Sequence, residues 1–208
     1  MSEYYIPTGP GEAEFTEKRS RFLGHVRMVE SEDEARAFIA DMKKKYYDAR
    51  HNCWCYSIKD GPERYSDDGE PQGSAGIPML EVLRRQNVTN AVCVVTRYFG
   101  GVLLGTGGLL RAYTKSTADA LEAAGISVVR RWVETELPCT YAQLERMKQE
   151  AASAGGIVED VEYGAGVTLR VMVPEEQSED FAARIFDRTA GSVTVRVTGE
   201  SFRAVPLR

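Results

Sequence analysis

The sequence predicts an α+β protein with two domains, residues 1–130 and residues 131–208. Its 208 residues are enough for one large or two small domains. Strand and helix patterns alternate along the chain, and the last third reads strand, helix, strand, strand, helix, strand. The charge divides as well, because residues 1–131 hold 18 basic and 18 acidic side chains, whereas residues 132–208 hold 8 and 13 and account for the net charge of −5.

Composition excludes several classes of protein. Hydrophobic residues make up 43% and charged residues 27% of the chain, which is ordinary for a soluble protein with a packed core. The first residues, MSEYYIPTGPGE, lack the basic and apolar regions of a secretory signal, and no apolar run approaches the ~20 residues of a membrane span. We therefore expect a cytoplasmic protein without a membrane segment. The net charge excludes a generally basic nucleic-acid binder, because nucleic acid is a polyanion.

A local basic patch is still compatible with this charge. Between residues 84 and 131, seven bases stand against two acids, Asp119 and Glu122. The bases are Arg84, Arg85, Arg97, Arg111, Lys115, Arg130 and Arg131. Such a run is usually a solvated face, but it is where an electrostatic footprint for an anionic partner is expected.

The first domain begins with a hairpin-like pattern over residues 12–29. Ser31 and Glu34 then form a capping box, which predicts a helix that ends in the three lysines at 43–45, where cations suit the helix dipole. A strand follows at residues 51–58. Pro78 suits the first turn of a short helix, and residues 91–98 form a strongly apolar strand.

A glycine-rich junction links that strand to a long helix that ends near Gly125. Its glycines are Gly100, Gly101, Gly105, Gly107 and Gly108. Glycine reaches positive φ cheaply and lets an anion approach, and a helix start exposes free N–H groups. Thr106 can cap this helix start, and no acidic side chain occupies it.

Cations near the junction lead to two interpretations. Arg97 precedes the glycines, and Arg111 and Lys115 form a basic row on the helix. In the first interpretation these residues and the glycines bind a phosphate, from a nucleotide or a nucleic-acid backbone. In the second, the glycines serve only packing, and Arg97 and Arg111 pair with acids elsewhere in the protein. The sequence leaves both open.

An acidic turn, SDDGEPQGSAG at residues 66–76, supplies acids of that kind. Asp67, Asp68 and Glu70 could hold Mg²⁺ beside a phosphate. They could also form salt bridges with Arg97 or Arg111, which we prefer because magnesium sites usually also need a substrate phosphate. In the plainest interpretation, the aspartates cap the backbone of their own turn.

A period-2 row on the strand at residues 51–58 is the one hint of a metal site. His51, Cys53 and Cys55 point to the same face of the strand and are possible zinc ligands. No fourth ligand stands at a recognised spacing, so we expect ordinary strand side chains and predict neither a metal nor a cofactor. The four cysteines also lack the dense spacing of a secreted disulfide scaffold.

Several blocks of the first domain resemble the signature of the Impact family. These are RYFGGVLLGTGGLLRAYTKS (97–116), SDDGEPQGSAGIP (66–78), ARHNCWCY (49–56) and the run Arg19–Phe22. They follow the family's order and cover nearly all of residues 1–130. Cys55 stands where the family commonly has a small residue such as Ala, which weakens the zinc hypothesis, and Ser74 replaces a usual Thr.

The resemblance implies a fold and a class of function. The implied fold for residues 1–130 is a ribosomal-protein domain-2-like sandwich with a left-handed βαβ crossover, as in domain IV of elongation factor G. Eukaryotic members of the family are translational regulators that bind the co-activator of a stress kinase. Bacterial, YigZ-type members have no agreed reaction, and their suggested role is association with nucleic acid or the ribosome. A metallopeptidase role lacks support, because the only histidines are His25 and His51.

The second domain is predicted as a ferredoxin-like βαββαβ unit. A strand at 132–137 leads to a helix opened by Thr140 and Gln143 and ended by the glycines at 155 and 156. Residues 157–163 and 167–173 form a hairpin, and a second helix runs from Pro174 to Gly191. Residues 192–203 are the last strand. The acidity of this domain suggests a protein partner, or simple solubility.

Three kinds of function are compatible with these features. The first is a translation- or stress-associated regulator that binds RNA or the ribosome through the N-terminal domain, with no catalytic residue. The second is an enzyme that acts on a phosphorylated small molecule or nucleotide at the glycine-rich cleft, with Asp67 or Asp68 carrying a metal and Arg97 stabilising charge. The third is a protein–protein regulator.

Overall fold

The computed structural model describes residues 3–207, which divide into two compact units. The N-terminal domain is Tyr4–Val129 and the C-terminal domain is Arg130–Arg203. Residues 204–207 group with the N-terminal domain, although they follow the second domain in sequence. Both domains mix helices with antiparallel sheet, so the predicted α+β class is confirmed. Within the described range, no helix has the length and apolarity to cross a bilayer.

A five-stranded sheet forms the centre of the N-terminal domain. Its spatial order is β2 (Gly11–Glu17), β3 (Ser20–Met28), β6 (Ala91–Tyr98), β4 (His51–Ser57) and β5 (Glu63–Ser66). Strands β3 and β4 both run antiparallel to β6 and are therefore parallel to each other. Helix α1 (Glu32–Lys45) connects them, so the unit β3–α1–β4 is a βαβ crossover with β6 between its strands.

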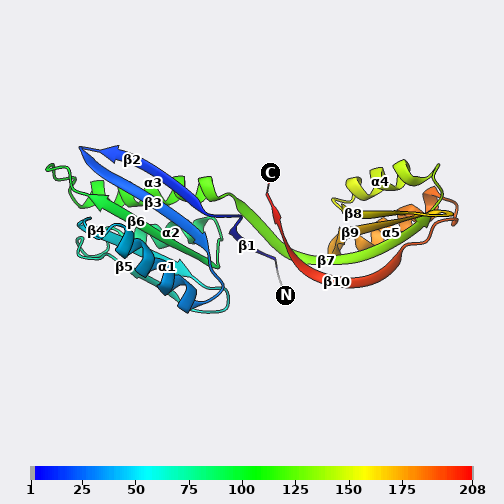
Figure 1. Cartoon of the computed structure of the whole chain (residues 1–208), viewed down its shortest axis with the longest axis horizontal. Coiled ribbons are helices and arrows are strands. Elements are labelled where there is room, and N and C mark those ends of the chain that lie inside the picture. The colour runs from blue at the N-terminus through cyan, green and yellow to red at the C-terminus, as the bar shows by residue number, and fades with distance from the viewer. Residues whose placement is uncertain (1–2, 208) are drawn as a thin grey trace. The chain divides into compact units, whose positions relative to one another are not determined.

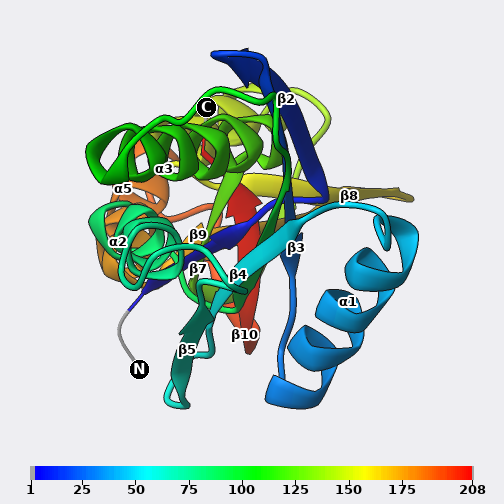
Figure 2. The ribbon, with the colours of Figure 1, turned by 90° about the vertical axis from the view of Figure 1, so that its left-hand side faces the viewer.

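Helices cover both faces of this sheet. Figure 2 shows α1 on one side and α2 (Gly76–Arg85) and α3 (Thr106–Ala124) on the other. The central strand β6 is buried along almost its whole length, and its residues alternate between two cores. Cys93 and Val95 pack toward α2 and α3, whereas Val92 and Val94 pack toward α1. This two-sided burial explains why β6 is a continuous apolar run and not an alternating one.

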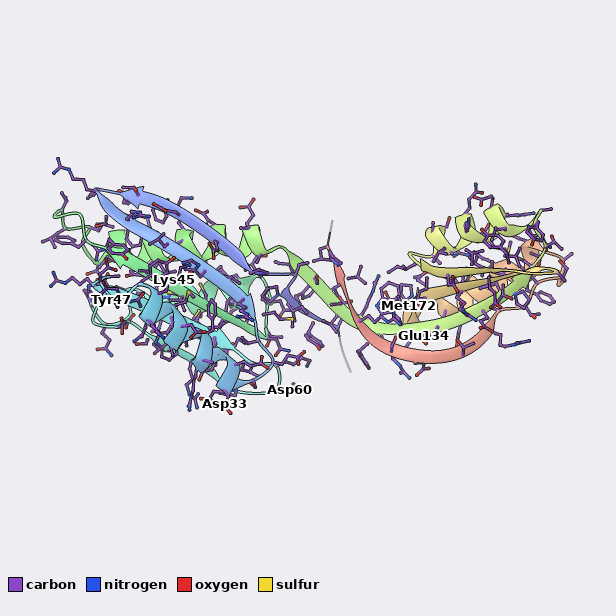
Figure 3. All side chains as sticks on the ribbon, in the orientation of Figure 1. Asp33, Lys45, Tyr47, Asp60, Glu134 and Met172 are labelled. Carbon is purple, nitrogen blue, oxygen red and sulfur yellow. The ribbon has the colours of Figure 1, made fainter. Side chains whose placement is uncertain are left out.

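Helix α1 begins and ends where its capping residues predict. The backbone N–H of Glu34 donates to Ser31 Oγ at 3.2 Å, and the Glu34 carboxylate accepts from the N–H of Glu30 at 2.8 Å. Figure 3 labels Asp33 near the first turn of the helix and Lys45 at its last. Acids at the start and lysines at the end both complement the helix dipole.

Two short strands, β1 (Tyr4–Pro7) and β5, were not predicted from the sequence. Strand β1 pairs with the first four residues of β7 (Ile126–Cys139), and β5 pairs with β4. Each has only four residues, too few to establish a period. Strand β7 is also longer than predicted, because it begins directly after Gly125, the C-cap of α3.

The C-terminal domain has the predicted βαββαβ order. Its elements are β7, α4 (Leu144–Ser153), β8 (Ile157–Tyr163), β9 (Val167–Pro174), α5 (Glu175–Arg188) and β10 (Arg196–Pro206), labelled in Figure 1. The sheet order β10-β7-β9-β8 is that of a ferredoxin-like fold. Glu134, labelled in Figure 3, accepts from Ser201 Oγ of β10 at 2.8 Å. The predicted start of the last strand at residue 192 is wrong, because residues 189–195 form turns around Gly191 at φ 77°.

Candidate functional site at the start of helix α3

The register of three strands brings Phe22, His51 and Arg97 side by side. Arg97 of β6 pairs with Phe22 of β3 on one side and with His51 of β4 on the other. Arg97 also stands two residues after Val95, so it continues the row that faces α2 and α3. A charged side chain therefore enters a core face at the end of the central strand.

Arg97 is held there by a buried ion pair with Glu70. Its Nη1 donates to Glu70 Oε1 at 2.7 Å, and the two side chains are 6% and 3% exposed. The Tyr113 hydroxyl donates to the same carboxylate oxygen at 2.8 Å, and Arg97 Nη2 donates to Ser20 Oγ at 3.2 Å. The Phe22 ring lies 5.6 Å from the guanidinium carbon. Burial, with Cys53 and Glu70 nearby, raises the pKa of Tyr113, so this phenol remains a donor.

This geometry corrects the role expected of Arg97. In the first interpretation the charge of Arg97 is free to bind a phosphate, but the carboxylate of Glu70 already neutralises most of that charge. The preferred interpretation of the acidic turn, a salt bridge to Arg97, is confirmed for Glu70. The ion pair does not fill the space around it, because Arg97 and Glu70 both line a cavity that opens beside α3.

The two aspartates of the turn have other partners. Asp67 Oδ1 accepts from the backbone N–H groups of Ala75 and Gly76 at 3.0 and 2.8 Å, at the start of α2, and its Oδ2 accepts from Gly73 N–H at 2.8 Å. The aspartate caps its own turn, as the plainest interpretation holds. It also places a negative charge at a helix N-terminus.

Asp68 ties the turn to its neighbours. Its carboxylate accepts from Lys43 Nζ at 2.6 Å and from the backbone N–H of Asn52 at 2.7 Å. The predicted alternative of a bridge from Asp67 or Asp68 to Arg97 or Arg111 is therefore wrong for both aspartates. Their oxygens are already engaged with the protein, which leaves little coordination for Mg²⁺.

The five glycines of the junction have different uses. A Cβ atom on Gly100 would lie 2.0 Å from the carbonyl carbon of Arg19, so this position requires glycine for close packing. Gly101 and Gly105 have φ of 83° and 72°, which favour glycine even though the space around them is open. Gly107 and Gly108 lie in the first turn of α3.

Thr106 does not cap α3 as predicted. The N-cap is Gly105, which has no side chain to donate or accept, and Thr106 is the first helical residue. No acidic residue stands in the first turn. The start of α3 therefore keeps its free N–H groups and its partial positive charge, unlike the start of α2.

Arg111 and Lys115 differ in their surroundings. Arg111 is exposed and, within residues 3–207, makes no ion pair or side-chain hydrogen bond. Lys115 pairs with Asp119 one turn later at 2.6 Å, and its ammonium lies 5.4 Å from the Phe15 ring centroid. Of the three predicted cations, Arg111 is the one that is free for a partner.

Four further bases lie around α3, of which only Arg85 belongs to the basic patch predicted from the sequence. They share exposure and, like Arg111, have no side-chain partner among the described residues; they are Lys18, Arg19, Arg50 and Arg85. We call these four residues and Arg111 the α3 face. Lys18 and Arg19 form the β2–β3 turn, with positive φ at both positions. No local pattern in the sequence marks Lys18, Arg19 or Arg50 as unpaired.

Three adjoining hollows are lined by four of these five bases, all except Arg19. The first, here called the α3 cavity, has about 380 Å³ and is lined by Arg50, His51, Glu70, Arg97, Phe99 and Thr106, among others. A second shares Leu104 with it and contains Lys18 and Arg111. A third shares Arg111 and Lys115 with the second and contains Arg85.

The possible zinc row faces inward. His51 Nδ1 lies 2.9 Å from the carbonyl of Asp68, and Cys53 Sγ donates to the carbonyl of Asp67. Cys55 stands opposite Cys93 in the strand pairing. Burial raises the pKa of both Cys53 and Cys55, which disfavours the thiolate form that binds metal. The described residues bring together no group of three or more side chains that could hold a metal ion.

Comparison with known proteins identifies the family. Residues 18–121 match the Impact N-terminal domain, and residues 137–192 match a domain of unknown function, DUF1949. The chain is 34% identical over 198 residues to the IMPACT family member YvyE of Bacillus subtilis, covering 94% of this chain and 91% of that protein. The chain belongs to the Impact family. The resemblance seen in the signature blocks is confirmed.

Other members of the Impact family match the chain over a similar length. YigZ of Escherichia coli is 34% identical over 197 residues, which cover 93% of this chain and 97% of that protein. A crystal structure of a hypothetical protein aligns with a TM-score of 0.60 and 33% identity, covering 96% of this chain and 98% of the other. These matches extend across both domains of this Impact protein.

Proposed function

We propose that this protein is a translation-associated regulator that docks on RNA, free or in the ribosome, through the α3 face of its N-terminal domain. Membership of the Impact family supports a regulatory role in translation. The observation that carries the finer proposal is the set of four unpaired bases, Lys18, Arg50, Arg85 and Arg111, that line three adjoining hollows around α3. Phosphate contacts are the main source of affinity for nucleic acid, and they need cations that the protein has not already neutralised.

Several bases of this domain outside the α3 face are already paired, although Lys44 is exposed and, within residues 3–207, unpaired as well. Arg84 pairs with Glu63 and Glu81, Lys43 pairs with Asp68, and Arg97 pairs with Glu70. These cations cannot bind a phosphate without giving up a carboxylate. The five bases of the α3 face have no such competition, and Glu17 is the one acid in the hollow that contains Lys18 and Arg111.

The glycine-rich loop adds apolar contacts to the same face. Phe99, Val102 and Leu103 are 40%, 39% and 83% exposed, so the loop presents large side chains to solvent. Aromatic side chains next to cations are typical of surfaces that bind single-stranded nucleic acid, since bases stack on the rings while the cations contact the backbone. The α3 face supplies the cations, and Phe99 of the adjoining loop supplies the aromatic ring.

The C-terminal domain has a surface of the opposite kind. Arg170 pairs with Glu136, Asp160 and Glu162, and Arg203 pairs with Glu134 and Glu159. These networks engage much of the acidic surplus within the domain itself. The proposal therefore assigns RNA contact to the N-terminal domain and leaves a protein partner as the role of the acidic domain.

Salt-dependent binding tests the proposal. Wild-type protein and the Lys18→Ala/Arg111→Ala variant are titrated against fluorescent single-stranded RNA over a series of salt concentrations. If both bases contact phosphates, the variant binds every sequence more weakly, and the slope of log K against log salt is smaller by about 1.4. Arg146→Ala is the matched control, because Arg146 is an exposed, unpaired base of the C-terminal domain.

Two results would contradict the proposal. One is wild-type binding that does not change with salt, since phosphate contacts always release counterions. The other is an equal loss of affinity in Arg146→Ala and in the Lys18→Ala/Arg111→Ala variant, which would mean that the α3 face has no special role.

A further inference from the structure

The α3 cavity contains a carboxylate oxygen that the protein leaves unused. Glu70 lines the cavity, and its side chain is 3% exposed. Both hydrogen bonds from Arg97 and Tyr113 go to its Oε1. Its Oε2 accepts no hydrogen bond from the part of the chain that the structure describes. A buried carboxylate oxygen in this position is an acceptor that favours a hydrogen-bond donor from a ligand.

A second acceptor faces the first. His51 Nδ1 lies 2.9 Å from the carbonyl oxygen of Asp68, which can only accept, so Nδ1 carries the ring proton. In the neutral imidazole this leaves a lone pair on Nε2. His51 Nε2 is 3.9 Å from Glu70 Oε2, too far for a direct hydrogen bond. The two acceptors fit one group that offers two N–H donors, such as an amino group.

Another wall of the cavity suits an anion. Gly105 and Thr106, at the start of α3, line the cavity together with the exposed base Arg50. Helix α3 has 19 residues, no capping side chain and no acid in its first turn. In contrast, the start of α2 is occupied by the carboxylate of Asp67. Free N–H groups and a guanidinium form a phosphate site that the protein does not fill itself.

The remaining wall is apolar. Phe99, Leu103, Leu104 and Leu109 line it, and Phe99 is 40% exposed. The volume of about 380 Å³ falls within the range of small-molecule sites. An occupant of this cavity therefore has a flat apolar part, an amino group and an anionic group.

We propose that the α3 cavity binds a nucleotide whose base carries an amino group at C4 of a pyrimidine or C6 of a purine, as in cytosine or adenine. The amino group donates to Glu70 Oε2 and His51 Nε2, the ring lies against Phe99, and the phosphate lies at the start of α3 beside Arg50. Uracil places a carbonyl oxygen where cytosine has the amino group, and that oxygen would face two acceptors. The nucleotide is either free or part of an RNA chain. If it is part of an RNA chain, the inference rests on the RNA docking proposed above.

Paired mononucleotides test the cavity by itself. Cytidine and uridine 5′-monophosphate differ at C4, which carries an amino group or a carbonyl oxygen, and at N3, which carries a hydrogen only in uridine. Their binding to the full-length protein is measured by calorimetry. Uridine monophosphate has no amino group to donate to the two buried acceptors. We therefore expect cytidine monophosphate to bind at least about tenfold tighter than uridine monophosphate.

Three variants separate recognition from folding. His51→Asn keeps an N–H donor for the Asp68 carbonyl and removes Nε2, so the preference for cytidine falls while the protein stays folded. Phe99→Ala, at an exposed position, weakens cytidine and uridine monophosphate alike. Glu70→Gln is the third variant, and it is interpreted only if its melting temperature stays near that of the wild type.

Short RNAs distinguish the source of the nucleotide. A cytidine octamer and a uridine octamer are compared in the wild type, in His51→Asn and in Lys18→Ala/Arg85→Ala, whose bases lie outside the α3 cavity. One result would place an RNA residue in the cavity. It is a preference for the cytidine octamer that is lost in His51→Asn and retained in Lys18→Ala/Arg85→Ala. A preference in mononucleotides with no octamer binding supports a free nucleotide and rejects RNA docking. Equal binding, or no binding, of cytidine and uridine ligands in both forms overturns the inference.

Discussion

Arg97 Nη1 lies 2.7 Å from Glu70 Oε1, and this buried ion pair fastens the acidic turn to the end of the central strand. The strand alternation of β6 directs Arg97 into the core face, where a lone charge would be strongly unfavourable. Glu70 arrives from the loop after β5, and Tyr113 of α3 donates to the same carboxylate. Three separate elements are thus held together by one carboxylate.

Breaking this pair should destabilise the N-terminal domain. Arg97→Met leaves the Glu70 carboxylate buried without its cation, which costs about 3–5 kcal/mol of unfolding free energy. Adding Glu70→Leu should recover part of that loss, because the pair is then replaced by apolar groups. Urea unfolding with pulsed alkylation of Cys53, Cys55 and Cys93 reports on this domain, since all three buried thiols belong to it. An exposed ion pair contributes at most about 1 kcal/mol. If the unfolding free energy of Arg97→Met stays within about 1 kcal/mol of the wild type, the buried pair is structurally unimportant.

Two glycines of the same loop and helix should respond in opposite ways to alanine. In Gly100→Ala the new Cβ meets the Arg19 backbone at 2.0 Å, so we expect a loss of about 1–3 kcal/mol. In Gly107→Ala the new Cβ lies 3.7 Å from the flexible end of Arg111, and the helical position gains about 0.4–1 kcal/mol. Thermal unfolding of the two variants measures the difference. The packing argument is wrong if Gly100→Ala is as stable as Gly107→Ala.

The buried thiols should be inert in the folded protein. Cys53, Cys55 and Cys93 are fully buried, and burial raises the pKa of Cys53 and Cys55, which suppresses the reactive thiolate. Cys139 is half-buried. A thiol reagent should therefore modify at most Cys139 in native protein and all four cysteines in denaturant. Rapid native labelling of Cys53 or Cys55 would contradict the described strand packing.

His25 should make the fold less stable in mild acid. Burial lowers its pKa below the ordinary 6.5, Lys45 lowers it further, and Glu12 opposes the shift. The unfolded chain then binds the proton more readily than the folded chain, so the contribution of His25 is present above about pH 6.5 and is lost as the pH falls. Chemical unfolding at about pH 7.5 and about pH 5.5 should show a smaller loss for His25→Gln than for the wild type. Equal losses in the two proteins would exclude His25 as the cause.

Local patterns in the sequence predict most of the fold. The apolar run at 91–98 corresponds to β6 over the same residues, and Ser31 with Glu34 marks the start of α1. These features are predictable because period and capping act over a few residues. Strand β1 is not, because its partner in β7 lies more than a hundred residues away and only four residues pair.

The candidate site is less predictable because it depends on pairing across the fold. Arg97 lies in one alternating row with Cys93 and Val95, so its place on a core face follows from the strand period once the strand is known to be buried on both sides. Which acid would meet it was open, since Asp67, Asp68 and Glu70 are equivalent in sequence and only the folded turn selects Glu70. The free bases Lys18 and Arg50 have no local signature, because a base is unpaired only by comparison with all its neighbours in space.

Photo-crosslinking in living cells tests the central claim of RNA docking most directly. A photoreactive amino acid replaces Leu103, which is 83% exposed on the glycine-rich loop, and in a second protein it replaces Tyr163, which is 61% exposed on the C-terminal domain. The account predicts that irradiation links RNA to position 103 and that little RNA is recovered from position 163. Crosslinks to protein alone at position 103, or equal recovery of RNA from both positions, would contradict it.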